Sequence, residues 1–244
     1  MRFFDYLIKL RGSYPEQSLI SLSSILGRTN LLSFGDMSDY WLQYASYRTP
    51  ASICNATAKW LWRFLEKSSP TVIVEFGTGF STYVIGAYAA WQKRTTGRSL
   101  RIVSVEHDEY WYERQRETLN SIKLQQFIEL AYSPLSSQRF YDEELVVYSE
   151  AKKVMEKVSS KSLADFVFVD GPLAIQYGGP GREGTIAQAI DLAREGGPIL
   201  IHDALRSEEF TAIQKVTKKR PALAKCIGII PVWYGLAVMR KLTR

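Results

Sequence analysis

Short apolar runs alternate with amphipathic stretches along most of this chain. The runs lie at residues 71–76, 101–106, 127–132, 164–170 and 198–203, and their length and their Val, Ile and Phe content predict buried strands. Between them apolar residues recur at helical spacing, in four sets: Val84, Tyr88 and Trp91; Val147, Ala151, Val154 and Val158; Ile186, Ile190 and Ala193; Phe210, Ile213 and Val216. Strands that alternate with helices predict an α/β fold with a doubly wound, parallel sheet.

The chain before the first strand has a helical pattern. Residues 13–26 place Leu19, Leu22 and Leu26 on one face, and a stronger helix is predicted to begin at Thr49-Pro50, where Thr suits the cap and Pro the first turn. Near the other end, residues 226–241 (CIGIIPVWYGLAVMRK) form two β-rich runs around a proline. We therefore expect an N-terminal helical extension or lid at 1–69 and a single α/β domain at 70–244.

The composition of the chain bears on its core, its cysteine chemistry and its cellular compartment. The chain has 244 residues, is 46% hydrophobic and contains two cysteines far apart in sequence, so we expect one sizeable core and neither a disulfide framework nor a zinc site. No apolar run approaches the roughly 20 residues of a membrane span, and the first residues, MRFFDYLIKLRG, lack a small-residue cleavage site. A cytoplasmic protein is the expectation.

The first strand leads into a glycine turn, at residues 71–82 (TVIVEFGTGFST). Gly77 and Gly79 lack a Cβ, so a ligand can approach the main chain there, and Ser81 or Thr82 can cap the following helix. The third glycine of a dinucleotide fingerprint is replaced by Thr82, which argues against pyrophosphate binding. Glu75 would repel phosphate and attract an ammonium group. The alternative is an ordinary tight turn with no ligand.

Polar residues also end the later strands. Glu106 follows the glycine turn at the interval expected of a carboxylate that binds ribose hydroxyls, although it could instead cap the helix near Asp108. Ser133 lies where an adenine edge could be met, or simply begins a Ser-Pro turn. Three more polar residues lie at the ends of the fourth and fifth strands: Asp170, His202 and Asp203. These ends meet at one edge of a parallel sheet, where ligands bind.

The order of these segments resembles the class I S-adenosylmethionine-dependent methyltransferases. VEFGTGFST, VSVEHD, FVFVDGP and LIHDA follow one another in the family's order, and the resemblance covers residues 71–239. It implies a seven-stranded, mostly parallel Rossmann-like sheet closed by a C-terminal antiparallel hairpin, an enzyme, and S-adenosyl-L-methionine (SAM) as cofactor. The cofactor-binding residues that it implies are Glu75, Phe76, Gly77, Thr78, Gly79, Ser81, Thr82, Glu106, His107, Ser133, Asp170 and Gly171.

Methyl transfer from a sulfonium needs a positioned acceptor and, for a hydroxyl, a base. Asp170, His202 and Asp203 are the candidate catalytic residues, with His202 or Asp203 as the base; alternatively, His202 is a core histidine and Asp203 a turn cap. Catechol-type O-methyltransferases bind a metal through acids at the positions of Asp170 and Asp203, followed by an asparagine. Here that residue is Ala204, which leaves one oxygen ligand fewer and weakens octahedral coordination. Metal use stays open.

The acceptor is the least constrained part. Arg182, in the glycine-rich segment 176–184 (QYGGPGREG), could pair with an acidic acceptor from a mobile loop, or be a solvated side chain. Tyr40 and Trp41 could hold a planar acceptor or pack the extension on the sheet. The formal charge is +6, but the basic cluster at 215–225 has no interleaved aromatics, which argues against nucleic acid.

We expect O-methylation of a small molecule or a sugar hydroxyl, and a homo-oligomer is compatible with the sequence. The alternatives are an inactive methyltransferase-like binding scaffold and a metal-dependent hydroxylase on a similar fold.

Overall fold

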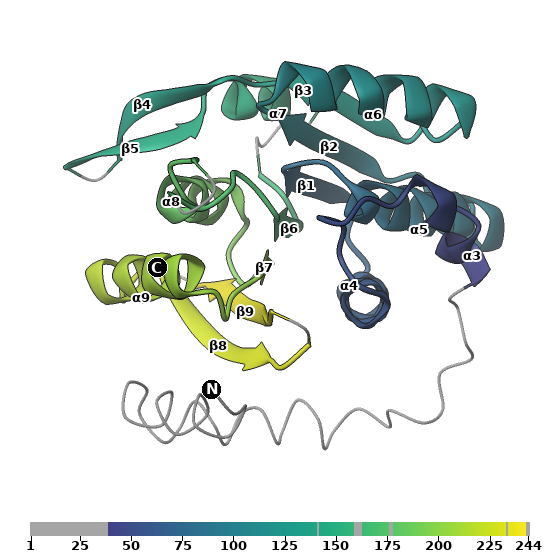
Figure 1. Cartoon of the computed structure of the whole chain (residues 1–244). Helices are drawn as coiled ribbons and strands as arrows, with labels where there is room; N and C mark the ends of the chain where they lie inside the picture. The colour runs from purple at the N-terminus through teal and green to yellow at the C-terminus, as the bar shows by residue number, and fades with distance from the viewer. Residues whose placement is uncertain (1–38, 141, 159–162, 176–177, 233, 243–244) are drawn as a thin grey trace.

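The computed structural model describes residues 39–140, 142–158, 163–175, 178–232 and 234–242. Its main sheet has seven strands in the order β3-β2-β1-β6-β7-β9-β8 (Figure 1). The strand bounds are β1 Val72–Phe76, β2 Arg101–Glu106, β3 Ile128–Tyr132, β6 Phe166–Val169, β7 Pro198–His202, β8 Ala224–Ile230 and β9 Leu236–Lys241. All pairs from β3 to β7 are parallel, whereas β9 pairs antiparallel with β7 and β8. The predicted seven-stranded, mostly parallel sheet and its closing antiparallel hairpin are confirmed.

Helices cover both faces of this sheet (Figure 1). Alternate strand residues point to opposite faces: Val74 and Val167 belong to the core cluster with α7, α8 and α9, whereas Ile73 and Phe166 belong to the cluster with α4, α5 and α6. The helix bounds are α3 Asp39–Leu42, α4 Asn55–Ser68, α5 Phe80–Thr96, α6 Glu109–Ser121, α7 Ala151–Val158, α8 Glu183–Leu192 and α9 Ser207–Lys219. Within the described ranges, no helix combines the length and apolarity needed to cross a membrane.

A second, two-stranded sheet departs from the sequence prediction. Strands β4 (Leu135–Phe140) and β5 (Glu143–Tyr148) form an antiparallel hairpin that projects beyond the main sheet (Figure 1). Val147, which we predicted in a helix with Ala151, pairs with Ser136 in this hairpin, and α7 starts only at Ala151. Both side chains are fully buried, although only Ala151 belongs to the core cluster of α7, α8 and α9, so their helical spacing reflects burial in two different elements and not one continuous helix.

The helix predicted to begin at Thr49-Pro50 begins later. Thr49 and Ser52 instead close a local turn, in which the Thr49 N–H donates to Ser52 Oγ at 2.9 Å. Helix α4 begins at Asn55, where Cys54 Sγ accepts from the N–H of Thr57 at 3.5 Å. The helix predicted at 13–26 lies outside the described residues, and the division of the chain at residue 69 stays a prediction.

Candidate cofactor and catalytic site

The proposed site residues gather where the parallel strands end. The chain leaves β1 toward β2 and β3 on one side and later returns to β6 on the other, so the strand order reverses between β1 and β6. Such a switch point opens a crevice at the carboxyl ends of the strands. Four strands deliver the predicted residues to this edge: β1 ends at Phe76, β2 at Glu106, β6 at Val169 just before Asp170, and β7 at His202.

The two glycines of the turn have different surroundings. Gly77 has φ of +80°, and a Cβ there would lie 2.8 Å from the backbone nitrogen of Gly171, so only glycine suits both its conformation and its packing. Gly79 has extended backbone, and a Cβ there would meet no described atom within 4 Å. Gly77 thus lets two loops pack closely, while Gly79 presents main chain to open space.

Helix α5 begins directly after this turn. Its first residue is Phe80, and the Thr82 hydroxyl accepts from the N–H of Gly79 at 3.0 Å. The N-cap residue is therefore Gly79, and the prediction that Ser81 or Thr82 caps this helix is wrong: both lie inside its first turn, from which Thr82 bonds back to the cap residue. Ser81 is fully buried, and its hydroxyl is one of the groups that lower the pKa of Glu75.

Glu75 is a buried carboxyl whose hydrogen bonds are incomplete. Its Oε2 accepts from Thr82 Oγ1 at 2.8 Å and from Ser104 Oγ at 2.7 Å. Its Oε1 is buried with no partner in the described structure. Burial raises the pKa of Glu75 to about 7, although the hydroxyl hydrogen bonds oppose the shift. A cationic group that reached Oε1 would complete this site and favour the ionised form.

Glu106 is the opposite case, a buried carboxylate with four hydrogen bonds. Oε2 accepts from the N–H and the hydroxyl of Thr78, at 2.9 and 2.7 Å, and Oε1 accepts from the N–H groups of His107 and Asp108, at 2.8 and 3.0 Å. Burial alone would raise the pKa of Glu106, but the His107 side chain, whose Nδ1 lies 3.0 Å from Oε1, and the bonds from Asp108 and Thr78 hold it below its ordinary value. The cap of α6 is Asp108, which accepts from Trp111 N at 2.9 Å. Glu106 is therefore a fixed anion beside the glycine turn.

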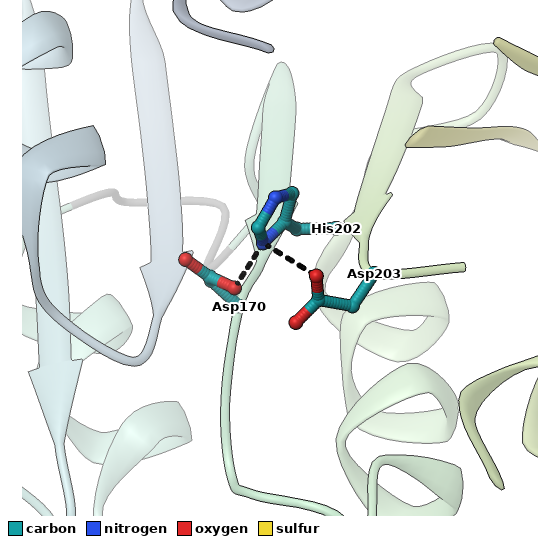
Figure 2. A group of neighbouring side chains, drawn as sticks. All are labelled: Asp170, His202 and Asp203. Carbon is teal, nitrogen blue, oxygen red and sulfur yellow. Dashed lines mark hydrogen bonds and ion pairs between the residues drawn. The ribbon is translucent and has the colours of Figure 1, made fainter. Parts of the chain in front are cut away.

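Asp170, His202 and Asp203 meet at the ends of β6 and β7. His202 Nδ1 lies 2.7 Å from Asp170 Oδ1 and 3.5 Å from Asp203 Oδ1, and Figure 2 shows the other ring nitrogen directed away from both carboxylates. That nitrogen, Nε2, is buried without a partner among the residues described. Burial lowers the pKa of His202, but the carboxylates of Asp170 and Asp203 more than offset this and place it above the ordinary histidine value. The arrangement leaves Nε2 available to accept a proton.

Arg182 does not lie where the sequence suggested. Its side chain is 2% exposed at the start of α8, and its guanidinium donates to the carbonyls of Pro172, Asp170 and His202. Of the loop predicted to be mobile, residues 176–177 lie outside the described residues. Because the guanidinium is enclosed by the strand ends, its burial does not fit the predicted contact with an acceptor.

The other predicted residues lie as follows. Trp41 is buried against Trp62, with ring centroids 5.2 Å apart, and Tyr40 stacks on the same ring at 5.7 Å, so the contacts of both favour the packing alternative. Ser133 lies beside Glu106, because its N–H donates to the Glu106 carbonyl at 2.7 Å, and its Oγ accepts from Glu150 N at 2.9 Å.

Tyr148 is a buried residue of this region that the sequence analysis missed. It ends β5, and its ring lies 5.3 Å from that of Phe76 and 5.7 Å from that of His107. Its hydroxyl is buried and has no partner in the described part of the chain, and burial raises its pKa well above the usual value. The signal was the apolar run 145–148 (LVVY), of which we had assigned Val147 to a helix.

No family model matches this chain, and no curated protein matches it in sequence. Solved structures are similar in fold. An O-methyltransferase from Bacillus cereus in complex with SAH has a TM-score of 0.54 and 16% identity, over 88% of this chain and 94% of that one. SAH-bound PaMTH1, a methyltransferase of Podospora anserina, has a TM-score of 0.55 and 16% identity, over 94% and 97%.

A third solved structure is the O-methyltransferase TomG from Streptomyces achromogenes, in complex with SAM. It has a TM-score of 0.54 and 15% identity, over 94% of this chain and 100% of that one. At these identities the likeness establishes the fold: this chain folds as these methyltransferases do.

Proposed function

We propose that this protein is a SAM-dependent O-methyltransferase. The observation that carries the proposal is the edge of β1 and β2, where open main chain at Gly79 lies near two buried acids, Glu75 and Glu106. SAM has an ammonium group, a sulfonium and ribose hydroxyls, which match a strand edge that combines open main chain with two acidic side chains. The shared fold with enzymes crystallised with SAM or SAH supports the same ligand.

The residues of this edge fit the cofactor. The unpartnered Oε1 of Glu75 is suited to the ammonium group, and Glu106, ionised and held by Thr78, to the ribose hydroxyls. Phe76, His107, Ser133 and Gly171 complete the proposed set around these acids. When bound, SAM supplies an electrophilic methyl group on sulfur. The protein must then position the acceptor and manage its proton.

His202 is the proposed base. Asp170 accepts from Nδ1–H, which fixes the neutral tautomer in which Nε2 carries the free lone pair. Nε2 then takes the proton of an acceptor hydroxyl as the oxygen attacks, and Asp170 stabilises the resulting imidazolium. Asp203 suits the base role less, because its Oδ2 already lies 3.6 Å from Arg182 and 3.1 Å from Arg206.

The acceptor we propose is a small molecule or a sugar hydroxyl, in the cytoplasm, and not a nucleic acid. The basic residues Lys215 and Lys219 support this, since both bond to the acidic side chain of Glu183 and so are partly neutralised. The binding-scaffold alternative accounts less well for a buried base with an unoccupied nitrogen. A homo-oligomer stays a prediction.

The test is methyl transfer from isotopically labelled SAM to a panel of phenolic, catecholic and sugar hydroxyl acceptors. We expect SAH formation that depends on one acceptor class. A protein that binds SAM but transfers to none of these acceptors would favour the scaffold. Oxygen consumption with the same panel would favour the hydroxylase.

A further inference from the structure

The ends of β6 and β7 hold a cluster with the side chains of a metal site. Asp170, His202 and Asp203 each offer one ligand atom, and these atoms lie within 4.8 Å of one another. Carboxylate and imidazole groups at this separation can hold a divalent ion. Their immediate neighbours decide whether they do.

Two guanidinium groups contact the same carboxylates. Arg182 Nη2 lies 3.4 Å from Asp170 Oδ1 and 3.6 Å from Asp203 Oδ2, so one buried cation bridges both acids. Arg206 Nη1 lies 3.1 Å from Asp203 Oδ2. The two negative charges that would attract a metal ion are therefore already balanced by two positive charges fixed in the protein.

We propose that Arg182 is a built-in cation that takes the electrostatic place of a divalent metal and keeps this cluster free of metal. Arg182 cannot withdraw easily, because its guanidinium also donates to carbonyls of both strand ends: Asp170 O at 3.0 Å, Pro172 O at 3.3 Å, and His202 O. An arginine stays charged at every physiological pH. A divalent ion would have to enter beside this charge, in a region with little water to screen the repulsion.

The remaining ligand positions point the same way. His202 directs Nδ1 into the cluster, where it forms a 2.7 Å hydrogen bond with Asp170. A metal ion bound to Nδ1 would have to displace that hydrogen bond. Ala204 is fully buried and offers no side-chain oxygen, and its N–H donates to the Gly235 carbonyl at 3.2 Å. Octahedral coordination by oxygen, which Mg²⁺ demands, lacks donors here.

Arg182 is thus a positioning residue. Located at the start of α8, it ties the ends of β6 and β7 together and holds Asp170 and Asp203 around His202. Its fixed positive charge balances the two carboxylates, as a bound metal ion would. The inference concerns only this cluster, and its metal-binding test needs neither SAM nor an acceptor, so its failure is distinguishable from failure of the proposed function.

The experiment is titration of the full chain with Mn²⁺, followed by electron paramagnetic resonance of the free ion and by calorimetry. We expect no binding to the unmodified protein at millimolar Mn²⁺. Arg182→Met, which keeps an unbranched apolar stem but removes the charge, should raise the affinity for Mn²⁺ at least about tenfold. Adding Asp203→Asn to this variant should abolish the gain.

Lys215→Met is the matched control. It removes a cation that pairs with Glu183 outside the cluster, and it should leave the protein without Mn²⁺ binding. Binding of Mn²⁺ by the unmodified protein that Asp203→Asn removes would overturn the proposal. So would a folded Arg182→Met protein that binds no Mn²⁺. Should that variant not fold, Mn²⁺ binding by the unmodified protein that Asp203→Asn removes would still overturn the proposal.

Discussion

The two halves of the strand edge carry similar acids in opposite electrostatic settings. At the ends of β1 and β2, Glu75 has no cation in ion-pair contact among the described residues, and one of its oxygens lacks any partner. At the ends of β6 and β7, Asp170 and Asp203 are balanced by two arginines and a histidine. In the first half a carboxyl oxygen is left without a partner, whereas in the second half the carboxylates are paired with cationic side chains of the protein.

This difference assigns different tasks to the two halves of one strand edge. An uncompensated buried acid is costly in the empty protein and becomes favourable when a cationic ligand arrives, so it suits binding. A neutralised network does not attract cations but holds an imidazole in one tautomer and orientation, so it suits proton transfer. Substitutions in either half test this difference. We expect them to change the rate of methyl transfer at one half, and SAM affinity and stability at the other.

The largest effect is expected at His202. Changing His202→Gln removes the proton acceptor, and the rate of transfer to a hydroxyl should fall by about 10²–10⁴-fold with little change in SAM affinity. The measurement is steady-state kinetics, with SAM affinity determined separately by calorimetry. In the unmodified protein the rate should rise with pH through the raised pKa of His202, because only neutral imidazole accepts a proton.

A contrasting variant is His107→Gln. His107 lies beside Glu106, with Nδ1 3.0 Å from Oε1, so its loss should alter cofactor affinity and leave the rising limb of the pH profile in place. Unchanged transfer by His202→Gln, or loss of the same limb in His107→Gln, would contradict the assignment of the base.

Glu75→Gln should weaken binding and strengthen the fold. Its folded pKa of about 7 lies above the ordinary 4.5, so the folded protein binds more protons than the unfolded chain between these values, and stability falls as pH rises through that window. Above pH 7 the neutral Gln avoids this loss, and the free energy of unfolding should increase by up to about 3 kcal/mol. Denaturant unfolding at pH 8 measures the gain, and calorimetry measures at least tenfold weaker SAM binding.

Glu106→Gln is the matched opposite. The pKa of Glu106 is lowered in the fold, so its ionisation contributes stability that is present above the unfolded pKa and lost as pH falls through the folded one. The Gln variant should be less stable at pH 8, by about 1–3 kcal/mol, and should also bind SAM less tightly. If both variants shift stability in the same direction, the contrast between the two acids is wrong.

The smallest effects should separate the two glycines. Gly77→Ala forces a Cβ into a positive φ and within 2.8 Å of the Gly171 nitrogen, so it should destabilise the fold by about 1–3 kcal/mol. Gly79→Ala meets no described atom and should leave the melting temperature nearly unchanged while weakening SAM binding. Thermal unfolding with and without SAM measures both. Equal loss of stability in the two variants would remove Gly79 from the proposed cofactor surface.

The local sequence pattern was sufficient to predict the elements whose structure depends on residues close together in the chain. Apolar periodicity predicted the strands and most crossover helices, and the glycine turn followed from the backbone freedom of Gly77. Glu75 and Glu106 were recognised because Glu106 ends β2 and Glu75 is the residue before the last of β1, and strand ends share one edge of a parallel sheet.

The features that the sequence did not predict depend on contacts between residues far apart in the chain. Glycines around Arg182 indicated a mobile loop, yet its guanidinium is buried by carbonyls from two strands, which no local pattern encodes. Tyr148 was missed, because its neighbour Val147 was assigned to a helix, and the hairpin that places Tyr148 beside Phe76 pairs residues across a turn. Trp41 could be read as a ligand-binding aromatic until its contact with Trp62 was known.

The most direct test of the central claim is calorimetric titration of the unmodified protein with SAM over a range of pH. We expect one site per chain, and an affinity that rises as Glu75 ionises through about 7 and falls as the α-amino group of SAM loses its proton near pH 8. Glu75→Gln should flatten the rising limb. Absence of binding at every pH, or an affinity that does not change with pH, would contradict a crevice in which a buried carboxylate receives a cationic cofactor.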